Sequence, residues 1–208
     1  MKHSFLTALL LAIATLMQAQ DAREVLDKTA DAIRRGGPSL IEFTATAFEG
    51  SDAGEAMTGT MAIDGKKYHL QSNGITIWYD GQTQWSYIHD SEEVNMTNPT
   101  EGETQMVNPY AFLNIYKEGY RLSIKKKTLR GFDTYEVRLR AKSKAQDVSE
   151  IYVDVKRDDF TPLCIRARQD NNWSRISIKS IKGGQHFASD RFTYNAAQHP
   201  DLEVIDLR

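Results

Sequence analysis

Turn signals recur about every ten residues through the first half of the chain, and they constrain the fold more than any other feature. Four pairs favour tight turns: Asp64-Gly65, Asn73-Gly74, Asp80-Gly81 and Asp90-Ser91. The runs between them are rich in β-branched and aromatic residues, and similar runs follow later, at residues 67–71, 75–79, 84–89, 93–97, 120–126, 134–141, 150–155, 162–169 and 173–181. With two earlier strands of period two, they predict a mainly β chain of about eleven antiparallel strands, in a strongly curved sheet or a barrel.

The N-terminus has the pattern of an export leader followed by a helix. Lys2 precedes an apolar run from Phe5 to Met17, which matches a signal-peptide core and is short for a membrane span. We expect cleavage after Ala19, export to the periplasm of a Gram-negative host, and a single domain over residues 20–208. A helix ending at Gly36-Gly37-Pro38 should open that domain, because an apolar stripe has helical spacing at Ala22, Val25, Leu26, Thr29, Ala32 and Ile33.

The composition argues against several classes of protein. Lys and Arg number 26 against 28 Asp and Glu, so nothing favours nucleic acid as a partner. A single cysteine, Cys164, leaves no thiolate metal cluster, and the five His lack metal-binding spacing. No nucleophile elbow, phosphate loop or dinucleotide fingerprint occurs. We therefore expect no enzyme activity, no metal and no cofactor.

Four arginines alternate along two strand-like segments: Arg138, Arg140, Arg166 and Arg168. One interpretation is an anion-binding or partner-docking patch. The other, which we favour, is the wet face of an amphipathic sheet, balanced by Glu136, Glu150 and Asp154.

Apolar and aromatic residues dominate the strands of the first half. They form either the filled core of a barrel or the lining of a cavity for an apolar ligand, and periodicity does not separate these two. The candidate lining residues are Phe43, Met61, Tyr68, Leu70, Ile75, Ile77, Trp85, Tyr87 and Met96 on strands, and Phe112 on a second helix that begins after Asn108-Pro109.

An ordered set of motifs resembles LolA-like outer-membrane lipoprotein carrier proteins. The hairpin Asp80-Gly-Gln-Thr-Gln-Trp-Ser-Tyr87 is similar to the family's Asp-Gly-Lys/Gln-Thr-x-Trp-x-Tyr. Around it, in the family's order, stand Phe43-Thr44-Ala45, Gly59-Thr60-Met61, an Asn-Pro-x-x-x-Leu helix from Asn108 to Leu113, and a closing Phe192-Thr193-Tyr194. The family's Arg-Pro pair before the strand of Tyr68 is missing, because the chain there reads Ile63-Asp-Gly-Lys-Lys67.

The resemblance implies a fold and a function. The fold is an unclosed antiparallel half-barrel of about eleven strands, with helices forming a lid over a hydrophobic cavity. The function is that of a monomeric periplasmic chaperone that binds the acyl chains of outer-membrane lipoproteins. It would take them from an inner-membrane ATP-driven release complex and deliver them to an outer-membrane acceptor. The alternative is a lipid- or lipoprotein-sensing regulatory module of related half-barrel fold.

Overall fold

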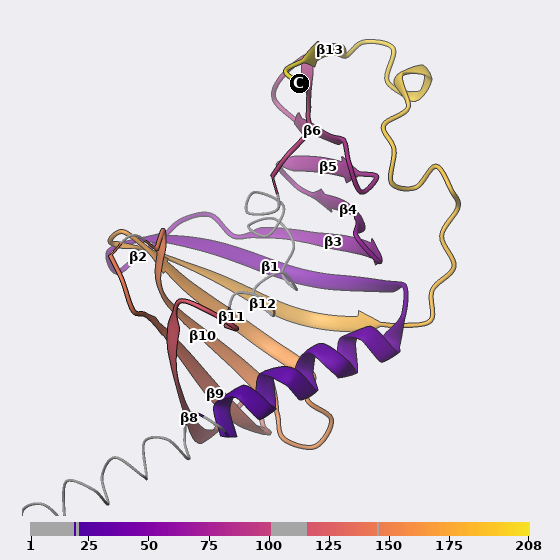
Figure 1. Ribbon diagram of the computed structural model, residues 1–208. Coiled ribbons are helices and arrows are strands. Elements are labelled where there is room, and N and C mark those ends of the chain that lie inside the picture. The colour runs from indigo at the N-terminus through magenta and orange to yellow at the C-terminus, as the bar shows by residue number, and fades with distance from the viewer. Residues whose placement is uncertain (1–18, 20, 101–115, 145) are drawn as a thin grey trace, which may run out of the picture. The chain divides into compact units, whose positions relative to one another are not determined.

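A computed structural model describes residue 19 and residues 21–100, 116–144 and 146–208 (Figure 1). The predicted leader, apart from Ala19, and the predicted second helix, apart from Tyr116, lie outside the described residues. The chain divides into two compact units. Unit 1 takes Met1–Ile33, Phe48–Asp52 and Phe112–Arg175, and unit 2 takes Arg34–Ala47, Ala53–Ala111 and Ile176–Arg208. The expectation of one domain over residues 20–208 stays a prediction.

Unit 2 is built from the hairpins that the turn signals predicted. Strands β3, β4, β5, β6 and β7 each pair with the next in antiparallel register, and β3 also pairs with β1. Their bounds are β1 Ser39–Glu49, β3 Met57–Asp64, β4 Lys67–Ser72, β5 Ile75–Tyr79, β6 Gln84–Ile88 and β7 Glu93–Thr97. At the turn before β6, the Asp80 carboxylate accepts hydrogen bonds from the backbone N–H groups of Gln82 and Thr83, at 2.9 and 2.8 Å. The local sequence therefore stabilises this turn.

Two short strands were not expected. The strand β13 (Glu203–Asp206) pairs with β7 in parallel, and β2 (Asp52–Ala53) pairs with β1. The segment before β13 is irregular except for the short 3-10 helix η1 (Ala196–Gln198) and a turn at Pro200-Asp201, where the N–H of Leu202 donates to the carbonyl of His199. A parallel partner so distant in sequence leaves no local pattern to recognise.

Unit 1 combines long antiparallel strands with the N-terminal helix. Strands β8, β9, β10 and β11 pair in sequence order, and unit 1 also takes the first four residues of β12, up to Arg175, while the rest of β12 belongs to unit 2. Their bounds are β8 Tyr120–Leu129, β9 Phe132–Ala141, β10 Val148–Lys156, β11 Pro162–Gln169 and β12 Asn172–Lys182. The turn between β8 and β9 places Arg130 and Gly131 at φ of 52° and 80°, as a two-residue hairpin of positive φ requires.

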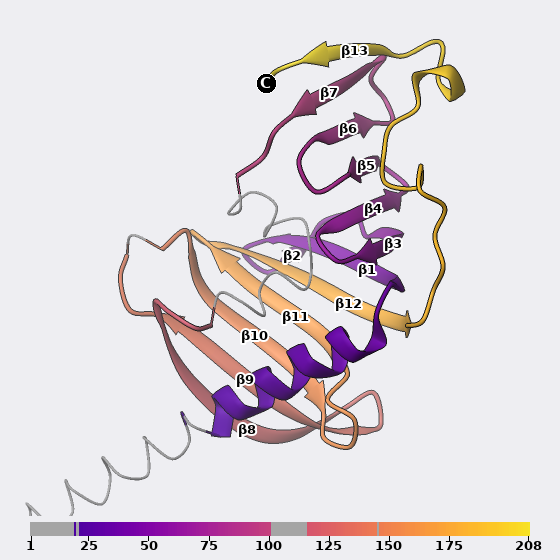
Figure 2. The same cartoon turned by 45° about the vertical axis from the view of Figure 1, so that its right-hand side comes forward.

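The helix over residues 21–36 crosses strands of unit 1 in both views (Figures 1 and 2). It ends where predicted, with Gly37 at a φ of 62° and its N–H donating to the carbonyl of Arg34. The side chains buried in this unit include Ala22, Val25, Leu26 and Thr29 on the helix and Val137, Leu139, Ile151, Val153 and Val155 on the strands. Helix stripe and strand rows together make the core of unit 1.

The strand order across the described residues is β13-β7-β6-β5-β4-β3-β1-β12-β11-β10-β9-β8, and the two terminal strands are not paired with each other. A sheet with two free ends is unclosed. The strand pairs whose register is given above are all antiparallel except that of β13 with β7. The predicted fold class, mainly β with an unclosed antiparallel sheet, is therefore confirmed.

Candidate functional site

One face of the unit 2 sheet is apolar across four neighbouring strands. Residues directly opposite each other in antiparallel pairs point to the same side, and the register aligns Ile41, Met61, Leu70 and Ile77 in one row. Alternate positions along the same strands lie on the same side. We call this surface the apolar face, and define it by Ile41, Phe43, Met61, Tyr68, Leu70, Ile75, Ile77 and Tyr79.

The register divides the predicted lining residues into two groups. Six of them lie on the apolar face: Phe43, Met61, Tyr68, Leu70, Ile75 and Ile77. The other strand residues do not join them, because Trp85 pairs with Trp78 and Met96, and Tyr87 pairs with Thr76, all on the opposite face. The register therefore does not bring all the predicted lining residues on strands to one side of the sheet. Phe112 lies outside the described residues.

The separation of these residues has a simple origin. Strand β5 is apolar on both faces, since it carries Ile77 on one side and Trp78 on the other. Alternation divides the residues of one strand between its two sides. It does not show which of these sides lies on the same face of the sheet as a given side of the next strand. That choice depends on the register through each turn, which only the structure supplies.

The apolar face is almost inaccessible to solvent. Ile41, Met61 and Tyr68 are 0% exposed, and Phe43, Leu70 and Ile77 are 6 to 7% exposed. Its phenol groups do not interrupt the apolar character, because the Tyr68 hydroxyl donates a 2.6 Å hydrogen bond to Oε1 of Gln84. Burial, with a smaller effect of Tyr79, raises the pKa of Tyr68, which therefore stays neutral over the physiological range.

The opposite face of the same sheet is covered by the segment that leads to β13. Trp78 stacks on His69 at a centroid distance of 5.4 Å and meets the edges of Tyr194 and His199 at 5.4 and 5.8 Å. Tyr194 also stacks on His199, and Phe192 is buried at 3% exposure. Phe192 and Tyr194 belong to the closing motif quoted above, so in unit 2 that motif forms aromatic core.

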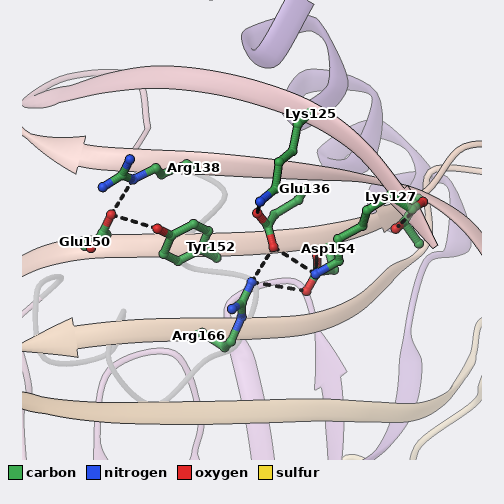
Figure 3. Close-up of polar contacts among 9 residues, drawn as sticks. Lys125, Lys127, Glu136, Arg138, Glu150, Tyr152, Asp154 and Arg166 are labelled. Carbon is green, nitrogen blue, oxygen red and sulfur yellow. Dashed lines mark hydrogen bonds and ion pairs between the residues drawn. The ribbon is translucent and has the colours of Figure 1, made fainter. Parts of the chain in front are cut away.

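Unit 1 presents a second surface, rich in charge. The register places Arg138 opposite Tyr152 and Tyr152 opposite Arg166, while Arg140 and Arg168 both lie opposite Glu150. The four arginines therefore share one face, as the sequence pattern predicted. Together with β8 they form what we call the charged face, defined by Lys125, Lys127, Glu136, Arg138, Arg140, Glu150, Tyr152, Asp154, Arg166 and Arg168 (Figure 3).

Buried carboxylates organise the charged face. Oxygen atoms of Glu136 lie 2.8 Å from Nζ of Lys125, 2.8 Å from Nζ of Lys127 and 2.6 Å from Arg166 (Figure 3). Asp154, 1% exposed, lies 2.9 Å from the ammonium of Lys127. Burial alone would raise the pKa of Glu136, but the hydrogen bonds from the three cations outweigh it and lower the pKa to about 2.

These contacts favour the second interpretation of the arginines. Arg166 is paired with Glu136, and Arg138 is paired with Glu150, which also accepts a hydrogen bond from the Tyr152 hydroxyl at 3.0 Å. The balancing residues are therefore those expected, but Glu136 and Asp154 are buried rather than wet. The sequence pattern does not show that a carboxylate is buried. A charged side chain is expected at the surface unless the cations that pair with it are known.

The described part of the chain contains neither a helix that could span a membrane nor a group of metal-ligating side chains. No helix there is long and apolar enough to span a bilayer. Nor do three His, Cys, Asp or Glu side chains among the described residues come together as metal ligands.

Comparison with known proteins identifies the family. Residues 13–171 match the family described as outer membrane lipoprotein carrier protein LolA. No curated protein matches the chain.

Solved structures share the fold at low sequence identity. An uncharacterized conserved protein from Thermus thermophilus is 8% identical with a TM-score of 0.60, over 89% of this chain and 99% of that one. A DUF1329 family protein from Desulfovibrio piger is 11% identical with a TM-score of 0.51, covering 86% and 98%. LprF from Mycobacterium bovis is 8% identical with a TM-score of 0.51, covering 82% and 97%. Because the family match spans well over half of its residues, the chain belongs to the family of the outer membrane lipoprotein carrier protein LolA.

Proposed function

We propose that this protein is a periplasmic carrier that binds the acyl chains of lipoproteins on the apolar face of unit 2. The observation that carries the proposal is the row Ile41, Met61, Leu70 and Ile77, which crosses four strands without a polar side chain. Phe43, Tyr68 and Tyr79 widen this row. A continuous apolar surface of this kind, in a chain of the LolA family, suits a hydrocarbon ligand.

The energetics explain why such a ligand needs a carrier. Each buried methylene is worth about 0.8 kcal/mol, so an acyl chain of about 16 carbons represents on the order of 12 kcal/mol. A lipoprotein with free acyl chains would not cross an aqueous compartment at a useful rate. In the proposed cycle, an inner-membrane ATP-driven release complex supplies the lipoprotein and an outer-membrane acceptor receives it.

The burial of the apolar face adds a requirement. Because Tyr68 and Met61 are 0% exposed, an acyl chain reaches them only after they are uncovered. Binding therefore includes a conformational step whose cost lowers the net affinity. A lowered affinity suits a carrier, since delivery requires that the acceptor bind the same acyl chains more tightly.

Photo-crosslinking of neighbouring residues on one strand tests the proposal. A photoreactive amino acid is placed at Ile77, on the apolar face, or at Trp78, on the opposite face. Each purified variant is mixed with a triacylated lipopeptide or with the same peptide lacking acyl chains. We expect ultraviolet crosslinking at position 77 to the acylated peptide alone, and none at position 78.

Two further positions make the test independent of a single variant. Leu70 shares the apolar face and should behave like Ile77, whereas Trp85 shares the opposite face and should behave like Trp78. Equal capture at both faces, or capture of the unacylated peptide, would contradict the proposal. Capture of the peptide part alone would instead favour a regulatory module that recognises protein.

A further inference from the structure

A pocket of about 450 Å³ opens on the charged face of unit 1, and none of its lining residues belongs to the apolar face. The lining comes from β8 to β12 and from the end of β1 with the turn that follows: Phe48, Gly50, Ser51, Lys125, Glu136, Tyr152, Arg166, Trp173, Ser174 and Arg175. All of these residues belong to unit 1. The volume lies in the range of small-molecule sites in proteins.

The pocket carries a positive charge. Three cations, Lys125, Arg166 and Arg175, line it against one carboxylate, Glu136, which leaves two positive charges. Because the pKa of Glu136 is lowered to about 2, after the opposing effect of burial, this count holds at neutral pH. The whole chain has a net charge of −2, so the pocket differs in sign from the molecule that contains it.

The cations are not equally committed to protein partners. Arg166 and Lys125 hydrogen-bond to Glu136, which fixes them along the pocket (Figure 3). The guanidinium of Arg175 instead lies over the ring of Phe48, 5.1 Å from its centroid. A guanidinium held over an aromatic ring keeps its N–H fork available for an oxyanion.

Aromatic rings supply the remaining walls. Tyr152 and Trp173 lie with ring centroids 5.9 Å apart, and Phe48 is the third ring of the lining. The guanidinium of Arg166 lies over the ring of Tyr152, 4.6 Å from its centroid. Such rings offer flat apolar contact that simple ions do not need.

From this combination we propose that the pocket binds a small organic phosphate, with the phosphate at Arg175 and an apolar or ring-shaped body against Phe48, Tyr152 and Trp173. A phosphate monoester carries about −1.5 to −2 charges at pH 7, which matches the two positive charges of the pocket better than a carboxylate does. The phosphate belongs either to a soluble ester or to the head group of a membrane lipid. The site shares no residue with the proposed acyl-binding face, and neither proposal depends on the other.

Nuclear magnetic resonance of the tryptophan side chains tests this site directly. The chain has three tryptophans, of which Trp173 lines the pocket, whereas Trp78 and Trp85 lie in unit 2. Phenyl phosphate is titrated into the full-length protein while the three indole N–H signals are followed. We expect a saturable shift of the Trp173 signal alone, at least tenfold weaker binding of inorganic phosphate, and no binding of phenol.

Arg175→Gln and Arg140→Gln form a matched pair of variants. Both arginines are exposed, and Arg140 lies on the charged face but outside the pocket lining. Arg175→Gln should abolish the shift and Arg140→Gln should preserve it. The proposal is overturned if Trp173 does not respond at about 10 mM ligand, if all three indoles respond alike, or if both variants weaken binding equally.

Vesicles distinguish the two sources of phosphate. Sedimentation with phosphatidylglycerol vesicles that depends on Arg175 and is competed by phenyl phosphate would identify a lipid head group. A response to phenyl phosphate without vesicle binding would identify a soluble ester. Both results support the pocket, and phosphatidylcholine vesicles serve as the control for surface charge.

Discussion

The two faces of the unit 2 sheet both bury apolar side chains, and they differ in the described contacts that each one makes. On the face of Trp78, the chain provides its own cover, with Tyr194 and His199 in ring contact with the indole. On the apolar face, the described ring and hydrogen-bond contacts stay within the strands, such as Tyr68 with Tyr79 and Tyr68 with Gln84. Both faces bury apolar side chains, but the described ring contacts from outside the strands lie on the face of Trp78.

The two faces also differ in whether their buried polar groups have hydrogen-bond partners. The covered face buries His69, and neither ring nitrogen of His69 has a hydrogen-bond partner in the described structure. The apolar face buries the tyrosine hydroxyl of Tyr68, which is satisfied by Gln84. Folding therefore tolerates an unpaired polar group on the covered face, where it costs on the order of 1–3 kcal/mol. This difference makes the two faces separable by experiment.

The largest expected effect is a pH dependence confined to the covered face. Burial, and to a lesser degree the charge of Arg191, lower the pKa of His69 to about 4. The unfolded chain thus binds a proton below about pH 6.5, while the folded chain resists it until about pH 4. Stability should fall by up to about 3 kcal/mol between these values, and His69→Phe should remove that loss.

Urea denaturation at a series of pH values measures this effect. The control is His186→Gln, because His186 is exposed and lies outside the strands of the sheet. Acyl binding by His69→Phe should be unchanged at pH 7, since His69 does not lie on the apolar face. A wild-type profile that is flat between about pH 6.5 and 4 would contradict the assignment of His69 as a buried neutral side chain.

A second prediction concerns the packing of the apolar face. A Cβ atom added at Gly59 would lie 2.5 Å from the carbonyl oxygen of Gln71 and 3.1 Å from Cζ of Phe43. Gly59→Ala should therefore destabilise the protein by about 1–3 kcal/mol, because a backbone oxygen has little room to move. Gly74→Ala is the matched control, since no atom lies within 4 Å of the Cβ position there. Equal thermal melting temperatures for the two variants would show that the strands separate easily at Gly59.

The sequence predicted the strands of these two faces better than it predicted the faces themselves. Local turn chemistry placed the hairpins, since Asp80 satisfies the N–H groups of its own turn. The side of the sheet on which Trp85 lies depends on the pairing of β6 through two turns, which places it opposite Trp78 on β5 and Met96 on β7. The parallel strand β13 and the cover formed by Tyr194 depend on contacts across more than a hundred residues, which periodicity does not record.

On the charged face, the sequence predicted which side the arginines share but not the pocket beside them. Period two correctly placed Arg138, Arg140, Arg166 and Arg168 on one side. The pocket beside them was not predicted, because Phe48, Trp173 and Arg175 come from strand ends that are distant in sequence. A mixed aromatic and basic pattern at the start of β12, in Trp173-Ser174-Arg175, was the one local signal.

The smallest predicted effect tests whether the apolar face is kept apolar for a ligand. Tyr68→Phe removes the 2.6 Å hydrogen bond to Gln84 and should cost about 1 kcal/mol of stability, measured by urea denaturation. It also makes the face more apolar at Tyr68, which is 0% exposed. If that face binds acyl chains, the variant should bind a triacylated lipopeptide at least as tightly as the wild type. A variant of unchanged stability that lost acyl binding would instead assign the Tyr68 hydroxyl a direct role in holding the ligand, and the apolar face would then have to be redrawn around that group.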